Sequence, residues 1–590
     1  MYARSFVQLV HYISKTIIMN STTKIDEIND HFKLPIFYNE RKVTLDPHIV
    51  ADLELICAVD PSCIPIYQHC FNTDNDVSAK LTEQLCATYS TDVAFLKDSQ
   101  SLLKSYTPLG VKYTDYSSNY KTIVGIWDEV KMDAGFNEKY CFVEWDVLAF
   151  LNRSEWFLQC VSVYNLMSPI ISLFVPIIIL IIPFFILQMR GLPITITEYV
   201  DVLKKVASQN AIGKLCVVNF SEINAQEKLY IFISAAFYLF SIYQNFMVCV
   251  KFNNNMKTIH SHFNELRIYI NHTIQSMDNY LKYASPLKSH SAFNAVLADK
   301  RDVLRKMLSN IETIADYNMF NFGKMKEIGY VFKCFYELHT DVVYDQTIMY
   351  SLGFNGYMDC LKGLLQNVTE RKMNFAVFAK KTTLVNSYYA PLKNTNPVKN
   401  TVRLKKNMII TGPNASGKTT VLKSTLINVL FSQQFGCGFY ESAKVSPFHH
   451  FHCYLNIPDT SGRDSLFQAE ARRCKDILDA IGASPTETHL CAFDELYSGT
   501  NPEEAEQSAT SFMKYITQFK NVSCMLTTHF VKVCAKLAKT KSVVNCKMLV
   551  DRAGDTLHYT YTLVDGISDI KGGLIVLKQL NYPKEIIDCM

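Results

Sequence analysis

The stretch IITGPNASGKTTVLK, residues 409–423, decides how the rest of this chain is interpreted. Gly412, Gly417, Lys418 and Thr419 fit the pattern G-x-x-x-x-G-K-[ST], a loop whose backbone amides surround nucleotide phosphates. The apolar run 407–410 predicts a buried strand before the loop, and 419–431 predicts a helix after it. Such a loop presents free N–H groups and the positive end of a helix dipole, which both suit phosphate. The sequence therefore predicts a nucleotide site here; the alternative is a plain glycine turn with a surface lysine.

The loop supplies most of the residues that we expect to bind ATP. The Lys418 ammonium would reach the β- and γ-phosphates, and the Thr419 hydroxyl would help to hold Mg²⁺. The complete set of loop residues expected to contact the nucleotide is Gly412, Pro413, Asn414, Ala415, Ser416, Gly417, Lys418, Thr419 and Thr420.

Two later segments complete the expected chemistry. The apolar run 489–493 predicts a buried strand that ends in the acidic pair Asp494 and Glu495. We expect Asp494 to hold the magnesium shell with Thr419, and Glu495 to polarise the attacking water. Residues 521–528 predict the next strand, with His529 at its end placed to sense the γ-phosphate. The candidate catalytic residues are Glu495, His529 and Lys418.

Four motifs in this order resemble the ATPase domain of the MutS family, the DNA mismatch repair ATPases. They are TGPNASGKTT at 411–420, SLFQAE at 465–470, FDELYSGTNPEEAEQSA at 493–509 and TTH at 527–529. The closing segment 561–588 is also similar to the family's last strand, glycine turn and helix, and Asn400 matches the Asn that precedes the family's loop. The form D-E-x-x-x-G-T separates MutS from other ABC-type ATPases, which usually carry D-E-P-[TS].

The resemblance implies a fold and a set of partners. It implies an α/β P-loop (ABC-type) ATPase domain at 386–590, using ATP and Mg²⁺. MutS ATPases work as dimers, so we expect a homodimer or a heterodimer with a related ATPase. In their composite sites the Ser of S-x-F-x-x-E, here Ser465 with Phe467 and Glu470, reaches the partner's γ-phosphate. DNA is the macromolecular partner that the family implies.

The remaining chain suggests three further regions. Residues 1–150 form a partly helical N-terminal domain of unclear fold, 151–255 two apolar helices with a loop, and 256–385 a mainly helical core or lever region. The first twenty residues are expected to form an amphipathic helix rather than a signal peptide. Within 256–385 an apolar stripe of helical spacing predicts a long amphipathic helix, made of Ile259, Phe263, Leu266, Ile270, Ile274, Met277 and Leu281.

Two apolar runs suggest contact with a membrane. One begins at Pro169 and ends at Leu187, has no charge, and carries prolines every seven residues, at 169, 176 and 183, which would kink a helix. The second begins at Leu229 and ends at Phe252. The alternative is a buried hairpin in a soluble core. The basic residues between the runs disagree with the positive-inside rule if the ATPase domain is cytosolic. The protein is thus expected at a membrane with the ATPase domain in the cytosol, or in the nucleus or cytosol if the runs are core helices. The runs resemble a divergent MutS-related branch with membrane segments.

Charge and cysteine content narrow the functions further. A net charge of +4 over 590 residues is too balanced to mark a nucleic-acid binder, so any DNA contact must come from a local patch. The 18 cysteines contain no C-x-x-C pair, which argues against a zinc ribbon. The histidine-rich segment 448–453 lacks metal-ligand spacing. Phe136-x-Glu138 and Phe142-x-Glu144 fit the Phe-x-Glu wedge of mismatch sensors, but in a phenylalanine-rich chain such short matches arise by chance.

Two functions therefore remain open. The first is a MutS-like ATPase that clamps DNA and switches helical arms with ATP. The second is a membrane-anchored MutS-related ATPase that acts on a protein or on DNA without mismatches. A structural protein with a dead site is disfavoured because Lys418, Thr419, Asp494, Glu495 and His529 are all present.

Overall fold

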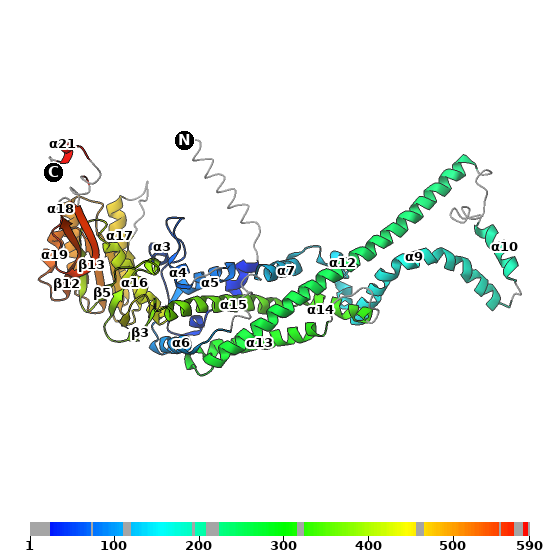
Figure 1. Cartoon of the computed structure of the whole chain (residues 1–590), viewed down its shortest axis with the longest axis horizontal. Coiled ribbons are helices and arrows are strands. Elements are labelled where there is room, and N and C mark those ends of the chain that lie inside the picture. Colours follow the sequence, from blue (N-terminus) through cyan, green and yellow to red (C-terminus); the bar gives the residue numbers. More distant parts are fainter. Residues whose placement is uncertain are drawn as a thin grey trace. The chain divides into compact units, whose positions relative to one another are not determined.

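The computed structural model in Figure 1 describes residues 24–71, 75–109, 120–191, 195–207, 224–314, 324–455, 465–553, 556–570, 577 and 582–587. The helix expected in the first twenty residues and part of the closing segment 561–588 lie outside these ranges. The chain divides into two compact units. The first holds Met1–Tyr120, Thr273–Asp302 and Thr347–Met590, and the second holds Lys121–His272 and Val303–Gln346.

A six-stranded sheet forms the centre of the C-terminal part of the first unit. Its strand order is β13-β12-β6-β11-β10-β9, and all neighbours are parallel except β12 and β13. The strands expected from the apolar runs are confirmed because each run forms a buried parallel strand. The bounds are β6 Asn407–Thr411, β9 His450–Tyr454, β10 His489–Asp494, β11 Val522–Thr528, β12 Val543–Ala553 and β13 Thr556–Asp565.

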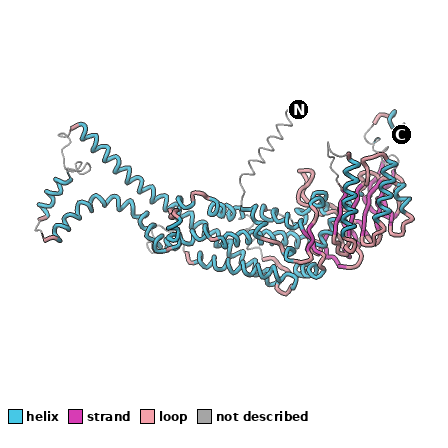
Figure 2. The backbone as a smooth tube through the Cα atoms, turned by 180° about the vertical axis from the view of Figure 1, so that it is seen from behind, coloured by secondary structure: helices cyan, strands magenta, loops and turns pink. Residues whose placement is uncertain are grey.

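A second, five-stranded mixed sheet lies in the same unit, in the order β5-β4-β8-β3-β7. Figure 2 shows that strands are concentrated in this C-terminal part, whereas helices dominate the rest of the described chain. The α/β class expected for the C-terminal part is therefore confirmed, with mixed sheets. The bounds are β3 Asn374–Phe378, β4 Thr383–Ser387, β5 Asn400–Arg403, β7 Cys437–Gly438 and β8 Ser442–Val445.

Helices cover both faces of the six-stranded sheet. On one face α17 (Leu466–Ala483), α18 (Pro502–Ile516) and α19 (Val531–Leu537) enclose a core with sheet residues such as Ile409, Phe493 and Leu526. Helix α16 (Lys418–Gln434) contacts β10 and β11 without belonging to this core, and so covers the other face. The short helix α21 (Lys584–Ile587) follows near the end of the chain.

Helix α16 is buried almost all round, because the N-terminal segments of the same unit cover its outer side. The Tyr67 hydroxyl donates to Gln434 Oε1 at 2.5 Å, and the Gln434 amide donates to the Leu85 carbonyl at 2.9 Å. Lys423 Nζ lies 2.9 Å from Glu54 Oε1. Residues near the start of the chain thus complete the fold around α16.

Short helices and one small sheet make up that N-terminal part of the first unit. Strands β1 and β2 pair antiparallel. The elements are η1 Lys24–Glu27, α2 Ile28–His31, η2 Pro35–Tyr38, β1 Lys42–Thr44, α3 Pro47–Asp52, α4 Ile66–Phe71, α5 Asp76–Ala87, β2 Thr88–Ser90 and α6 Val93–Ser105, and the unit also holds η5 Lys288–His290 and η7 Ala390–Leu392.

The second unit is helical. Three helices, α12 (Ala225–Ala284), α13 (Ser291–Glu312) and α15 (Val342–Thr369), belong partly to each unit. The expected amphipathic helix is confirmed within α12, where six of the seven stripe residues are buried and Leu281 is half-buried. The other elements are α7 Tyr120–Met132, α8 Phe136–Tyr140, η4 Asp146–Arg153, α9 Glu155–Met189, α10 Ile196–Ala207, η6 Lys324–Glu327 and α14 Ile328–Thr340.

Both Phe-x-Glu matches belong to the core of this second unit. Phe136 is 1% exposed and stacks on the His339 ring at a centroid distance of 3.9 Å. Phe142 is also buried and packs on the Tyr336 ring. Neither ring is available in this position to stack on a base, in agreement with their interpretation as chance matches.

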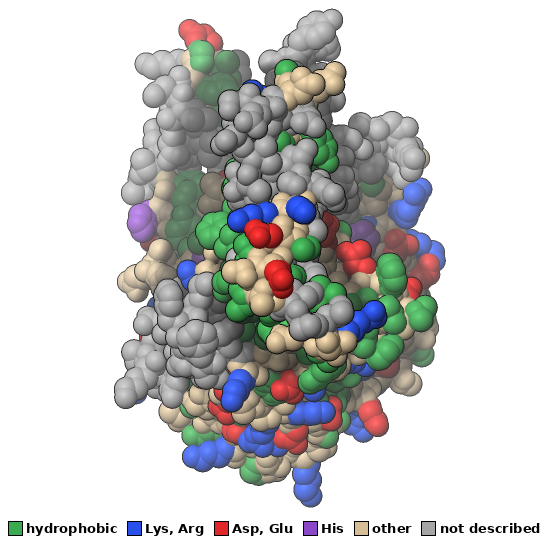
Figure 3. Space-filling view, turned by 90° about the vertical axis from the view of Figure 1, so that its right-hand side faces the viewer, with side chains coloured by type: hydrophobic (Ala, Val, Ile, Leu, Met, Phe, Trp, Pro, Cys, Tyr) green, Lys and Arg blue, Asp and Glu red, His purple; other side chains and the backbone are tan. Residues whose placement is uncertain are grey.

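The two apolar runs lie on α9 and on the first part of α12. The helices touch where the Tyr238 hydroxyl donates to the Ser172 carbonyl at 3.3 Å, and α9 is visibly bent, as its prolines predict. By length and composition, Glu155–Phe174 and Lys228–Ala284 could each cross a bilayer, which is weak evidence by itself. Only 17% and 6% of their apolar windows are buried. In the view of Figure 3, hydrophobic side chains lie among Lys, Arg, Asp and Glu side chains.

Candidate nucleotide site

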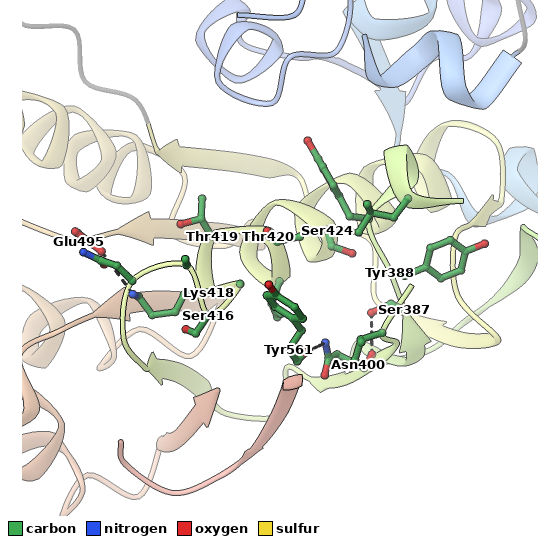
Figure 4. Close-up of a pocket in the computed structure, with 17 residues that line it drawn as sticks. Ser387, Tyr388, Asn400, Ser416, Lys418, Thr419, Thr420, Ser424, Glu495 and Tyr561 are labelled. Carbon is green, nitrogen blue, oxygen red and sulfur yellow. Dashed lines mark hydrogen bonds and ion pairs between the residues drawn. The ribbon is translucent and has the colours of Figure 1, made fainter. Parts of the chain in front are cut away.

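Three neighbouring strands bring the predicted site residues to one edge of the six-stranded sheet. Asp494 at the end of β10 pairs with Thr527 of β11, and Thr528 pairs with Thr411 at the end of β6. The glycine-rich loop 412–417 then connects β6 to α16 (Figure 4). In parallel sheets ligands bind beyond these carboxyl ends, so the predicted residues meet where a ligand is expected.

The glycines of the loop are required by its backbone and its close contacts. Gly417 is the N-cap of α16 with a φ of 93°, in the left-handed region that favours glycine. A Cβ there would lie 3.2 Å from the Tyr561 ring, and a Cβ on Gly412 would lie 2.8 Å from Ser416 Oγ. No side chain caps α16, so the backbone N–H groups of its first turn remain available to donate hydrogen bonds to a ligand.

Two buried polar groups of the loop also fit an anionic ligand. Ser416 is 1% exposed, and its Oγ has no hydrogen-bond partner among the described residues. Lys418 is 5% exposed, and its Nζ donates to the carbonyls of Gly412 at 3.1 Å and Pro413 at 3.3 Å. Buried polar atoms usually have partners, so the unpartnered hydroxyl beside a buried ammonium suits phosphate oxygens.

The oxygen atoms expected to hold magnesium are adjacent. Thr419 Oγ1 donates to Asp494 Oδ2 at 2.8 Å, and the Thr527 hydroxyl donates to the other Asp494 oxygen. Carboxylate and hydroxyl oxygens are the ligands that Mg²⁺ prefers, together with water and phosphate. The pair Thr419 and Asp494 can therefore supply two oxygen ligands to a metal–nucleotide complex.

A short chain of charges links the three candidate catalytic residues. Glu495 Oε1 lies 2.6 Å from His529 Nε2 and 3.8 Å from Lys418 Nζ. The hydrogen bond with His529 lowers the pKa of the Glu495 carboxyl despite its burial, and the charge of Lys418 lowers it further. Burial lowers the pKa of Lys418, against the opposing effect of Glu495 and Asp494. Glu495 is thus held ionised, as a group that accepts a proton from water must be.

The loop opens into a pocket of about 480 Å³, a size typical of small-molecule sites. Its polar side is formed by loop residues and Glu495, and its apolar side by Tyr388, Leu392, Val398 and Tyr561. This division fits a nucleotide, with phosphates on the polar side and a base on the apolar side.

Asn400 fixes the position of Tyr561 in that pocket. Its Nδ2 donates to the Tyr561 carbonyl at 2.9 Å (Figure 4). Its Oδ1 accepts from the Leu563 amide at 2.7 Å. Tyr561 has a φ of 55°, which is strained for a tyrosine and needs such support. Sequence reasoning did not place Tyr561 at the site, although the closing family-like segment 561–588 begins with this residue and Asn400 matches the family.

The predicted residues differ in how closely they approach the pocket. Gly412, Pro413, Asp494 and His529 lie beside the lining without belonging to it, and Ser465 lies outside it. The remaining predicted residues line the pocket: Asn414, Ala415, Ser416, Gly417, Lys418, Thr419, Thr420 and Glu495.

Ser465 has a structural role in this chain as the N-cap of α17. Its Oγ accepts from the Gln468 amide at 3.3 Å, while the Gln468 side chain accepts from the Ser465 amide at 2.9 Å. Buried Glu470 on the same helix accepts from Ser498 Oγ at 3.0 Å and from the Gly499 amide at 3.1 Å. These bonds tie the start of α17 to the loop that follows Glu495.

The contact between Gly499 and α17 yields a testable prediction. A Cβ on Gly499 would lie 2.7 Å from Leu466 Cγ and 2.9 Å from the Phe467 amide. We expect Gly499→Ala to lower the free energy of unfolding by about 1–3 kcal/mol, as overpacking does, measured by thermal or denaturant unfolding. In the control Gly482→Ala, on the contacted helix α17, the new Cβ meets nothing within 4 Å. Equal stability of the two variants would contradict the prediction.

The histidine-rich segment forms a ring stack rather than a metal cluster in the described residues. His450 and His452 of β9 stack with His489 of β10, and His452 Nε2 lies 3.1 Å from His489 Nδ1. Burial lowers the pKa of His452 to about 3, so its ring is neutral.

Comparison with known proteins relates the segment that carries this site to a protein family. The family model "MutS domain V" matches residues 408–590. The chain is 28% identical over 209 residues to "Endonuclease MutS2" of Staphylococcus epidermidis, which covers 35% of this chain and 26% of that protein. It is 29% identical over 184 residues to the protein of that name from Fusobacterium nucleatum, covering 30% and 22%. With the Lactococcus lactis protein the identity is 26% over 232 residues, covering 39% and 28%. The matches thus span only about a quarter of the length of these relatives.

Proposed function

Because this chain is a member of the MutS family, with domain V at residues 408–590, we propose that it binds and hydrolyses Mg²⁺-ATP as a MutS-like DNA-binding ATPase. In this proposal the C-terminal region predicted at 386–590 is a P-loop (ABC-type) ATPase domain. One observation carries the proposal: the chain Lys418–Glu495–His529 and the pair Thr419–Asp494 meet beside a pocket with an unpartnered buried hydroxyl.

The loop would bind the phosphates. Free amides of the loop and of the first turn of α16 point to the ligand, and Ser416 Oγ adds a further donor. The Lys418 ammonium would balance the charge of the β- and γ-phosphates. A bound magnesium ion would neutralise further phosphate charge, held by Thr419 and Asp494. Tyr561 and Tyr388 would contact the base.

Glu495 would position the attacking water. Its carboxylate is ionised, and His529 holds one of its oxygens, so the other oxygen can accept a hydrogen bond from water. His529 would keep this carboxylate in place and sense the γ-phosphate, which is the role expected from its position at the end of β11.

A second copy of the chain, or a related ATPase, would complete the site. Ser465 is exposed and lies outside the pocket of its own chain, which supports an action on a partner's nucleotide. Closing of the dimer would then depend on bound ATP. Through its hydrogen bond with the Gly499 amide, Glu470 would couple nucleotide binding at one site to the other site.

DNA is the proposed macromolecular partner, moved by the helical region predicted at 256–385. The relatives are named endonucleases. The matched family model covers the segment with the nucleotide loop, so the match supports the ATPase part of the proposal, and strand cleavage is not proposed for this chain. Neither Phe-x-Glu match supports recognition of mismatches, because Phe136 and Phe142 are both buried.

The test is ATP hydrolysis by the full chain in detergent, with and without DNA. We expect magnesium-dependent hydrolysis that heteroduplex, branched or plain duplex DNA changes, and DNA binding that weakens with salt. Hydrolysis that DNA does not change would support the ATPase part of the proposal and contradict DNA as the partner. An intact protein without magnesium-dependent hydrolysis would overturn the proposal.

A membrane-anchored ATPase is the second candidate, favoured by the exposed apolar surface of α9 and α12. Phe185 is 58% exposed, and Phe232 and Phe237 are 73% and 70% exposed. In this form the protein would be held at a membrane with its ATPase domain in the cytosol. Extraction of cell membranes with alkaline carbonate distinguishes the candidates: an anchored protein stays with the membrane, and release like a soluble enzyme would exclude the anchor.

A further inference from the structure

A basic hollow of about 420 Å³ lies at the edge of the six-stranded sheet opposite the nucleotide site. It is formed where strands begin: Lys405 and Lys406 precede β6, and Lys520 precedes β11. Lys380 and Lys381, between β3 and β4, complete it. The five residues of β6, which make four steps of about 3.3 Å, separate the two edges by about 13 Å. The hollow is therefore a separate place from the ATP pocket.

The lysines around the hollow form a positively charged patch, and no acidic side chain among the lining residues offsets their charge. All five lysines are exposed, and no Asp or Glu is among the lining residues. Within the described ranges none of the five forms an ion pair. Lys539 and Lys541 are exposed close by in the sequence, just before Ser542, which also lines the hollow. Since the net charge of the chain is only +4, this is the kind of local patch on which contact with a polyanion depends.

Other side chains of the hollow fit a nucleic acid better than an acidic peptide. Ser446, Gln518 and Ser523 add uncharged polar groups of the kind that contact phosphate and sugar. Phe519 lines the hollow next to Lys520, and its ring packs edge-on against Tyr515 at a centroid distance of 5.4 Å. Tyr515 contacts Phe519 without lining the hollow itself, and it is 52% exposed. Aromatic rings beside lysines allow bases to stack while phosphates are neutralised, whereas an acidic peptide would use the charges alone.

We propose that this lysine-lined hollow binds the sugar–phosphate backbone of a DNA strand, at the opposite edge of the sheet from the ATP pocket. The inference rests on the proposed function for the identity of the nucleic acid, but not on any contact made by the helical region. The C-terminal part of the chain would thus contact DNA directly.

The test removes four of the lysines in the full-length chain. The variant K380A/K381A/K405A/K406A is compared with K97A/K362A/K475A/K514A, which loses the same charge from four exposed lysines elsewhere in the first unit. Binding of a labelled DNA oligonucleotide, single-stranded or duplex, is measured by fluorescence anisotropy over a salt series. Thermal unfolding and ATP hydrolysis without DNA show that both variants are folded.

The expected result is a loss of affinity of at least about tenfold at low salt for the first variant only. Its plot of log affinity against log salt should flatten by at least about 1, since each lost phosphate contact lowers the slope by about 0.9 on duplex and about 0.7 on single strands. Equal binding by the two variants would overturn the inference and leave the proposed function intact. A polyglutamate probe that binds as tightly and with the same salt dependence as DNA would overturn the nucleic-acid assignment. Absence of DNA binding by the unmodified chain would overturn both the role of the hollow and the proposal of DNA as a partner. ATP hydrolysis measured without DNA tests the ATPase proposal separately.

Discussion

Lys418→Ala abolishes ATP hydrolysis in our first prediction, with a rate at least about 100-fold below that of the unmodified protein. Lys418 is the buried cation of the loop and lies 3.8 Å from Glu495. Its removal takes away the charge-assisted hydrogen bonds to phosphate, which contribute about 1.5–3 kcal/mol each, and a positive charge that stabilises the transition state. Affinity for ATP should fall with the rate, because the same bonds hold the ground state.

The measurement is phosphate release, together with titration of a fluorescent ATP analogue. Lys536→Ala is the matched control, since Lys536 is an exposed lysine on α19 away from the pocket. If Lys418→Ala and Lys536→Ala hydrolyse ATP equally, the pocket beside the glycine-rich loop is not the site of hydrolysis.

Glu495→Gln separates hydrolysis from binding, which is our second prediction. Glutamine keeps the shape of the side chain and can still bond to His529, but it cannot accept a proton from water. We expect the rate to fall by about 10²–10⁴-fold, as for loss of a general base, while ATP affinity stays close to that of the unmodified protein. A protein that holds ATP without consuming it should also stay dimeric longer.

Single-turnover hydrolysis and equilibrium binding of ATP measure the two effects. Glu503→Gln is the control, because Glu503 is an exposed carboxylate in the first turn of α18. Equal hydrolysis rates in Glu495→Gln and Glu503→Gln would exclude Glu495 as the residue that activates water. A large loss of ATP affinity would assign Glu495 to binding instead.

Much of the site could be predicted because its residues are local in sequence. Residues 411–420 form one continuous segment from the end of β6 to the start of α16, and buried apolar runs place Asp494 and the Thr527–His529 segment at the ends of adjacent strands. Parallel strands align their carboxyl ends, so these segments had to meet. The apolar stripe of α12 could be predicted for a similar reason, since helical spacing specifies which side chains share a face.

Contacts between distant segments could not be predicted in this way. Tyr561 reaches the pocket through an unusual backbone angle and the two hydrogen bonds of Asn400, 161 residues away in the chain. The basic hollow collects lysines from three separate turns, none of which is basic enough to stand out alone. The burial of α16 by residues such as Tyr67 and Leu85 has no pattern in the sequence either, because polar and apolar side chains are both buried around that helix.

The enclosed position of α16 has a practical consequence for any attempt to dissect the molecule. A fragment that starts near residue 386 would keep every motif of the nucleotide site but lose the N-terminal helices. Phe431, Phe435 and the amide groups of Gln433 and Gln434 would then face water on the outer side of α16. Such a fragment is expected to aggregate, and a graft of this segment onto a relative would need the beginning of the chain as well. The segment that folds around the candidate nucleotide site is thus longer than the stretch that carries its motifs.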